Sequence, residues 1–311
     1  MSISRRNFVK SLTIGSAVAL SGIPFLVSGK KDKFSKLTIL HTNDTHSRLD
    51  PFPANHHRYP SMGGYARRSS LIDQIRANEE HVLLFDSGDI FQGTPYYNFF
   101  GGKPELELMS KMKYDASTIG NHEFDNGLEE FLKVMPYANF PFISSNYDFS
   151  DTVLKDRTIS HKVFFKDNLK VGVYGLGVKP DGLISKNLFG DTKYIDPIEK
   201  AKEMESHLKK ELKCDLIICL SHLGYEYETD AVSDTVLAEN TSYTDIILGG
   251  HSHTILDKPE KKLNLEKRTV HIGQTGIYGI RLGRMDIWFN ENKSQILVEG
   301  NTINISKNQA L

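Results

Sequence analysis

Five predicted strands in this chain each end in a short polar sequence, and this repetition constrains the fold more than any other feature. In layered α/β folds, ligand sites gather at the carboxyl ends of the strands. One histidine after a strand is usually an ordinary loop residue, whereas five polar strand ends in one chain predict a shared site. The residues at these ends are Asp44 and His46, Asp89, Asn121 and His122, His222, and His251 and His253.

Strand and helix patterns alternate along the chain, which is typical of a layered α/β domain. We predict strands over 37–42, 82–85, 116–119, 140–146, 169–176, 216–220, 245–248, 268–272, 281–290 and 295–305. We predict helices over 66–78, 104–113, 128–135 and 197–213. Asp196 and Pro197 supply an N-cap and a first-turn proline for the last helix.

The stretch 114–125, YDASTIGNHEFD, is the densest of the polar strand ends. Gly120 permits a sharp end to the strand and a close approach of the backbone to a ligand. The residues that follow it bring an asparagine, a histidine and two carboxylates into one turn. This combination is unfavourable in a helix and indicates a ligand-binding or catalytic site.

Composition sets broad limits on function. The chain has 311 residues, of which 39% are hydrophobic and 25% are charged, and these values are typical of a globular protein. The net charge of −1 gives no basic excess that would indicate nucleic-acid binding. Cys214 and Cys219 are interpreted as packing residues on opposite faces of one strand, about 17 Å apart and unable to pair.

Residues 4–10, SRRNFVK, match a twin-arginine pattern and precede a mildly apolar run over 11–28. That run is too short and too weakly apolar to predict a stable membrane span. We therefore predict a twin-arginine signal peptide over 1–29 and a catalytic domain over 30–311, exported or periplasmic. A retained N-terminal anchor helix is the alternative.

Histidine and carboxylate ligands suit divalent Zn, Mn, Fe or Co. Seven such side chains supply two metal sites if one carboxylate is shared. Two ions about 3.5–4 Å apart activate a bridging water and stabilise both the attacking and the leaving oxygen of a phosphate displacement. Asp89 follows a glycine and can stand clear of the backbone, so it is the candidate bridge.

Five motifs resemble those of the bacterial 5′-nucleotidase branch of the calcineurin-like metallophosphoesterases. They are LTILHTNDTH (37–46), SGDIFQGTPYYNFFGG (87–102), YDASTIGNHEFDNG (114–127), SHLGY (221–225) and GGHSHT (249–254). They occur in order, and the resemblance extends from residue 37 to about residue 283. It implies an α/β fold, a four-layer α/β/β/α sandwich with two mixed β-sheets.

The resemblance also implies a role for each polar residue. Asp44, His46, Asp89 and His253 would bind one metal ion, and Asp89, Asn121, His222 and His251 would bind the other. His122 and Asp125 would form the catalytic dyad, in which the carboxylate orients the imidazole. The nucleophile would be a hydroxide that bridges the metals. Glu123 receives no role beyond support of the turn.

The resulting prediction is a metal-dependent phosphoric ester hydrolase of the 5′-nucleotidase type, active in nucleotide catabolism on a small phosphorylated substrate. A 2′,3′-cyclic-nucleotide phosphodiesterase would use the same ligands. A sulfur-ester hydrolase on a related fold is a further alternative. Because we expect no C-terminal nucleotide-binding domain, the chain is also a candidate catalytic subunit for a separate nucleotide-binding polypeptide.

Four residues outside the motifs are weaker candidates. His56 and His57 lie in a loop that would rim the cleft. His271 and Gln274 lie near a strand end, where lining the site and packing are equally compatible with the sequence.

Overall fold

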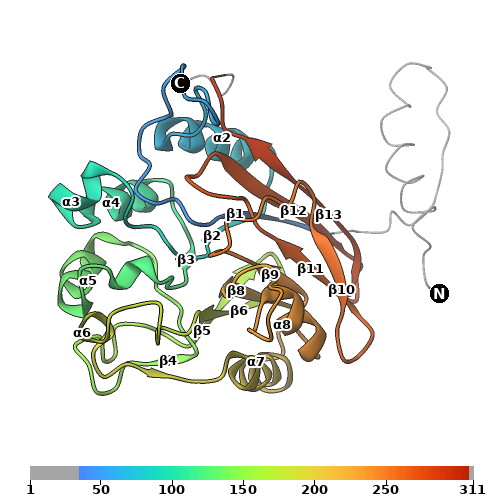
Figure 1. Ribbon diagram of the computed structural model, residues 1–311. Coiled ribbons are helices and arrows are strands. Elements are labelled where there is room, and N and C mark those ends of the chain that lie inside the picture. The colour runs from blue at the N-terminus through green and yellow to red at the C-terminus, as the bar shows by residue number, and fades with distance from the viewer. Residues whose placement is uncertain (1–34, 308–311) are drawn as a thin grey trace, which may run out of the picture.

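The computed structural model describes residues 35–307 (Figure 1). The predicted signal peptide over 1–29 lies outside these residues. No helix in the described part of the chain is long and apolar enough to cross a membrane.

Two mixed sheets form the centre of the molecule (Figure 1). The first has the order β13-β12-β1-β2-β3, in which β1, β2 and β3 are parallel, β12 is antiparallel to β1, and β13 is antiparallel to β12. Its strands are β1 (Ser35–Thr42), β2 (Val82–Asp86), β3 (Ala116–Ser117), β12 (Arg281–Phe289) and β13 (Gln295–Asn304).

The second sheet has the order β10-β11-β9-β8-β6-β5, with four parallel strands between two antiparallel edge strands. Its strands are β5 (His161–Lys166), β6 (Leu169–Gly177), β8 (Leu216–His222), β9 (Ile246–Leu248), β10 (Glu260–Leu263) and β11 (Thr269–Gly273). A small separate ribbon pairs β4 (Tyr147–Asp148) with β7 (Lys193–Tyr194).

Helices cover the outer face of each sheet (Figure 1). The helices are α2 (Tyr65–Asn78), α3 (Pro95–Phe100), α4 (Lys103–Lys111), α5 (Leu128–Val134), α6 (Lys186–Phe189), α7 (Pro197–Ser206) and α8 (Asp234–Asn240). Two 3₁₀ turns, η2 (His122–Phe124) and η3 (Met135–Tyr137), and a π-helical turn, η4 (His207–Glu211), complete the described elements.

Three hydrophobic clusters separate four layers. In β8, Leu216, Ile218 and Leu220 pack between the two sheets, while Ile217 and Cys219 pack toward α7 and α8. This alternation follows from the two-residue period of a strand. A third cluster joins α2, α4 and α5 to the outer face of the first sheet. The α/β/β/α sandwich of two mixed sheets is therefore confirmed.

Two sequence predictions about local structure are wrong. Residues 140–146 form no regular strand, since Phe142 and Ile143 make only isolated bridges, to Ser117 and Ile159. Cys214 and Cys219 pack into the same cluster rather than on opposite faces, because Cys214 precedes the start of β8 and escapes its alternation. Both cysteines are buried and free.

Candidate metal centre

Parallel strands bring the polar loops together. The loop after β1 runs along the loop after β2, because the Asp44 and His46 amides donate to the carbonyls of Gly88 (2.9 Å) and Asp89 (3.1 Å). The loops after β8 and β9 adjoin them, since the His251 amide donates to both carboxylate oxygens of Asp44 (3.1 and 3.0 Å). Side chains from both sheets thus reach one place.

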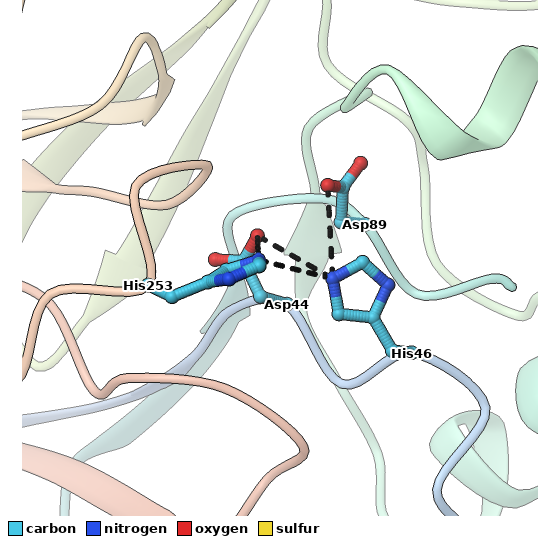
Figure 2. A group of neighbouring side chains, drawn as sticks. All are labelled: Asp44, His46, Asp89 and His253. Atoms are coloured by element: carbon cyan, nitrogen blue, oxygen red, sulfur yellow. Dashed lines mark hydrogen bonds and ion pairs between the residues drawn. The ribbon is translucent and has the colours of Figure 1, made fainter. Parts of the chain in front are cut away.

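The first group of candidate ligands comprises Asp44, His46, Asp89 and His253, whose ligand atoms lie within 4.8 Å of one another. In Figure 2 the dashed interactions of Asp44, Asp89 and His253 all meet at Nε2 of His46. Nε2 of His253 lies 3.3 Å from Oδ1 of Asp44 and 3.2 Å from Nε2 of His46. Nε2 of His46 lies 4.0 Å from a carboxylate oxygen of each aspartate.

The second group comprises Asp89, His222 and His251, again with ligand atoms within 4.8 Å of one another. Nε2 of His222 lies 3.1 Å from Oδ2 of Asp89 and 3.3 Å from Oδ1 of Asn121. Asp89 belongs to both groups, and the same oxygen, Oδ2, faces a histidine of each. This geometry suits a shared carboxylate.

Backbone carbonyls orient two of the imidazoles. Nδ1 of His222 lies 2.7 Å from the Ser87 carbonyl, and Nδ1 of His46 lies 3.2 Å from the Phe91 carbonyl. A carbonyl can only accept, so each Nδ1 carries a proton and each Nε2 faces the carboxylates. Metal-binding histidines in proteins commonly have this second hydrogen bond.

The backbone at the candidate ligands is strained. Asp44, His46, Asp89, His251 and His253 all have positive φ, between 45° and 70°. This conformation is uncommon outside glycine, and such residues cost about 1–3 kcal/mol each and cluster at functional sites. The fold therefore holds these side chains together against local backbone preference.

The charges of the cluster favour a cation. Burial lowers the pKa of His222, but the charge of Asp89 and its hydrogen bond outweigh burial and raise that pKa to about 10. Burial raises the pKa of Asp89, but His222 and His46 outweigh it, so that pKa lies well below its usual range. Burial lowers the pKa of His251 to about 4, which leaves a neutral imidazole. The pocket thus attracts positive charge and also offers a neutral nitrogen ligand.

Small residues leave room for this convergence. A Cβ at Gly120 would lie 2.2 Å from Oδ1 of Asp89, and one at Gly250 would lie 2.9 Å from Nδ1 of His222. Both contacts are shorter than any side chain tolerates. The donor set, its orientation and the space around it fit two divalent cations.

The His122–Asp125 pair lies beside the first group. Nδ1 of His122 is 2.8 Å from Oδ2 of Asp125, and the His122 ring is 5.1 Å from the ring of His46. Burial lowers the pKa of His122, but the Asp125 hydrogen bond and the charges of Asp89 and Asp125 outweigh it, so the pKa is raised. Each side chain of the pair is 30% exposed, so the pair is accessible from solvent.

Glu123 does more than support its own turn. Its carboxylate is buried and accepts from the amides of Asp89 (3.0 Å), Ile90 (2.8 Å) and Gly120 (2.6 Å). It therefore joins the loop of the shared aspartate to the loop of Asn121. Burial, followed by the charge of Asp89, raises the pKa of Glu123 to about 7. The sequence shows the acid but not these partners, which lie more than thirty residues away in two cases.

Gln274 holds the loop of His251 and His253. It is buried, its Nε2 donates to the Gly250 carbonyl (2.7 Å), and its Oε1 accepts from the Thr254 amide. His271 instead lines a cavity of about 500 Å³ beside Asp245, which precedes β9 at the opposite end of that strand from His251. Gln274 therefore supports the loop that carries two candidate ligands, whereas His271 lies on β11 and lines that cavity.

Comparison with known proteins identifies relatives of the chain. Residues 37–254 match the family model described as calcineurin-like phosphoesterase. The chain is 39% identical over 232 residues to a 5′-nucleotidase of Vibrio cholerae, covering 71% of this chain and 41% of that protein. It is 33% identical over 293 residues to the trifunctional nucleotide phosphoesterase YfkN of Bacillus subtilis, covering 84% of this chain and 18% of that protein.

Comparison with solved structures finds relatives of the same kind. A 5′-nucleotidase precursor from Thermus thermophilus superposes with a TM-score of 0.81 at 30% identity, over 89% of this chain and 56% of that chain. The YfkN structure from Bacillus subtilis superposes with a TM-score of 0.72 at 27% identity, over 89% of this chain and 92% of that chain. The chain spans about half the length, or less, of the curated relatives that it matches.

Proposed function

The chain belongs to the calcineurin-like phosphoesterase family, and from this premise we propose that it is a two-metal phosphomonoesterase that hydrolyses 5′-nucleotides. One observation carries the proposal. Two groups of candidate ligands share Asp89, and a His–Asp pair lies beside them. Its relatives by sequence include proteins named 5′-nucleotidase.

We assign the two groups to two divalent ions. Asp44, His46, Asp89 and His253 would hold one, and Asp89, Asn121, His222 and His251 would hold the other. When bound, such ions lower the pKa of a coordinated water and offset negative charge on a phosphoryl group.

The chain's own residues then have separate tasks. Asp125 accepts from Nδ1 of His122, which leaves Nε2 of that imidazole to hold a proton for the substrate. The raised pKa of His122 favours the charged imidazolium, which stabilises negative charge on phosphoryl and leaving-group oxygens. Glu123 and Gln274 hold the ligand loops in register.

A substrate panel tests the proposal. The full chain is assayed for phosphate release from AMP, a UDP-sugar, a 2′,3′-cyclic nucleotide and an aryl phosphate, with Mn, Zn, Fe or Co added in turn. We expect AMP to give the highest kcat/KM. Removal of metal by a chelator should abolish the activity, and addition of one of these metals should restore it. An absence of hydrolysis of every ester with every metal would overturn the proposal.

A cyclic-nucleotide phosphodiesterase activity is the second candidate. It is favoured by the similarity to YfkN, whose name describes a trifunctional nucleotide phosphoesterase. In the same panel, a higher kcat/KM for the cyclic diester than for AMP would establish it as the main activity.

Export by the twin-arginine pathway is proposed from residues 4–10 alone. Replacing Arg5 and Arg6 with lysine should retain the protein in the cytoplasm, and unchanged export would refute the signal.

A further inference from the structure

A group of aromatic side chains extends outward from the candidate metal centre. The Tyr278 ring lies 6.0 Å from the ring of His46, 5.4 Å from Phe52 and 6.3 Å from Tyr59. The His56 ring lies 4.4 Å from Phe52 and is nearly parallel to Tyr59, at 5.8 Å and 10°. We name Phe52, His56, Tyr59 and Tyr278 the aromatic ledge.

The ledge is attached to the same backbone as the candidate ligands. Three of its residues belong to the loop between β1 and α2, which also carries Asp44 and His46. Tyr278 comes from the loop between β11 and β12, and its amide donates to the Asp44 carbonyl (2.7 Å). Its φ of 62° gives it the same strained conformation as the ligands. The fold thus holds this ring beside the metal centre at a local cost.

Apart from Phe52, the side chains of the ledge are not buried in the hydrophobic core. None of its four residues belongs to the three hydrophobic clusters of the described chain. Phe52 is 6% exposed and forms the floor, while the other three side chains are half-buried. The ledge therefore offers partly open ring surface close to where a phosphoryl group would sit.

Arg48 lies against the ledge. Its guanidinium carbon is 4.4 Å from the Phe52 ring centroid and 5.7 Å from that of Tyr278. No ion pair among residues 35–307 involves Arg48, and within that range its buried Nε has no hydrogen-bond partner. A cation of this kind can stack on a ring or donate to ring nitrogens and carbonyls.

We propose that the aromatic ledge, with Arg48, binds the planar heteroaromatic base of a nucleotide whose phosphate lies at the metal centre. The inference rests on the proposed function and deepens it, because it assigns base recognition to residues of the catalytic domain itself. Half-exposed tyrosines are suited to stacking, which tolerates different bases. The ledge would therefore favour nucleotides over phosphate esters without a base, with little preference among bases.

The test compares AMP with ribose 5-phosphate, which presents the same phosphoester without the base. We measure kcat/KM for both with the full chain and with Tyr59→Ala and Tyr278→Ala. The ratio of AMP to ribose 5-phosphate should fall about 5- to 100-fold in each variant, which is the scale of one lost stacking contact. Tyr278→Phe keeps the ring and should retain the preference for AMP. Tyr137→Ala, which removes an exposed tyrosine ring on η3 outside the ledge, is the control and should leave the ratio unchanged.

Each outcome decides the inference separately from the proposed function. If the wild-type chain hydrolyses both esters equally well, or if the variants lower both equally, the ledge does not read the base. If neither ester is hydrolysed, the proposed function fails, and binding of adenosine then tests the ledge. Saturation-transfer NMR should show contact with the adenine protons in wild type and its loss in the Tyr59→Ala/Tyr278→Ala double variant. Absence of contact in wild type would overturn the inference.

Discussion

The two ligand groups that share Asp89 differ in how closed they are. His222, in the second group, is fully buried, whereas the side chain of His253, in the first group, is 40% exposed. The first group also adjoins His122 and Tyr278, through the ring of His46. We therefore expect the second position to retain its ion and the first to meet the substrate.

This difference shows how one sheet edge provides two environments. His222 is the last residue of β8 and is held by the rigid strand and the Ser87 carbonyl. His253 lies in the loop beyond β9, where the loop and its hydrogen bonds to Gln274 fix it. We expect the buried position to bind its ion more tightly and the open position to exchange it more readily.

Asp89→Asn should have the largest effect, because it removes the carboxylate common to both groups. We expect nearly complete loss of activity, with fewer than two ions per chain by elemental analysis. Because both metal positions depend on this carboxylate, its removal should weaken metal binding at both of them. A variant that still holds two ions would show that Asp89 is not the bridge.

His122→Ala should lower turnover by about 10²–10⁴-fold, the usual scale of general acid–base catalysis. Both ions should remain bound, since His122 belongs to neither group. This variant therefore separates loss of chemistry from loss of metal. Unchanged kcat would refute the assignment of the dyad.

His222→Ala and His253→Ala form a matched pair that tests the comparison itself. We expect His222→Ala to weaken metal binding by more than about 100-fold and His253→Ala to weaken it by about 10-fold. These values lie at the two ends of the 10- to 100-fold loss, roughly, that follows removal of a residue supporting a metal ligand. Calorimetric titration of the metal-free variants measures both. Equal losses would show that burial does not distinguish the two positions.

Asp125→Asn should have the smallest effect on activity, and the pH dependence of kcat measures it. Asp125 helps to raise the pKa of His122, so the charged imidazole persists to higher pH and is lost as pH rises through that pKa. Without the carboxylate charge, the basic limb of kcat should move to lower pH. A profile whose basic limb is unmoved would exclude His122 as the titrating group.

The central strands and their polar ends were predicted well, because strand period and glycine position are local signals. The two mixed sheets were expected only from the family resemblance that the five motifs carry. The edge strands β5 (HKVFFK) and β10 (EKKL) were missed, because lysine-rich edges lack the apolar pattern of central strands. The residues 140–146 were overpredicted, because their apolar side chains pack while the backbone makes only isolated bridges.

Other features depend on contacts between distant loops and could not be predicted. Glu123 reaches the Asp89 amide from 34 residues away, and the Tyr278 amide meets the Asp44 carbonyl from across the chain. Neither partner leaves a sequence pattern. The same holds for the backbone strain at Asp44 and His251, which only the folded chain imposes.

Anomalous diffraction from crystals grown with Mn²⁺ tests the central claim most directly. Two peaks about 3.5–4 Å apart are expected, both within bonding distance of Asp89, with the peak beside His253 the weaker of the two. A single peak, or two peaks of which only one contacts Asp89, would contradict a two-ion centre built on a shared carboxylate.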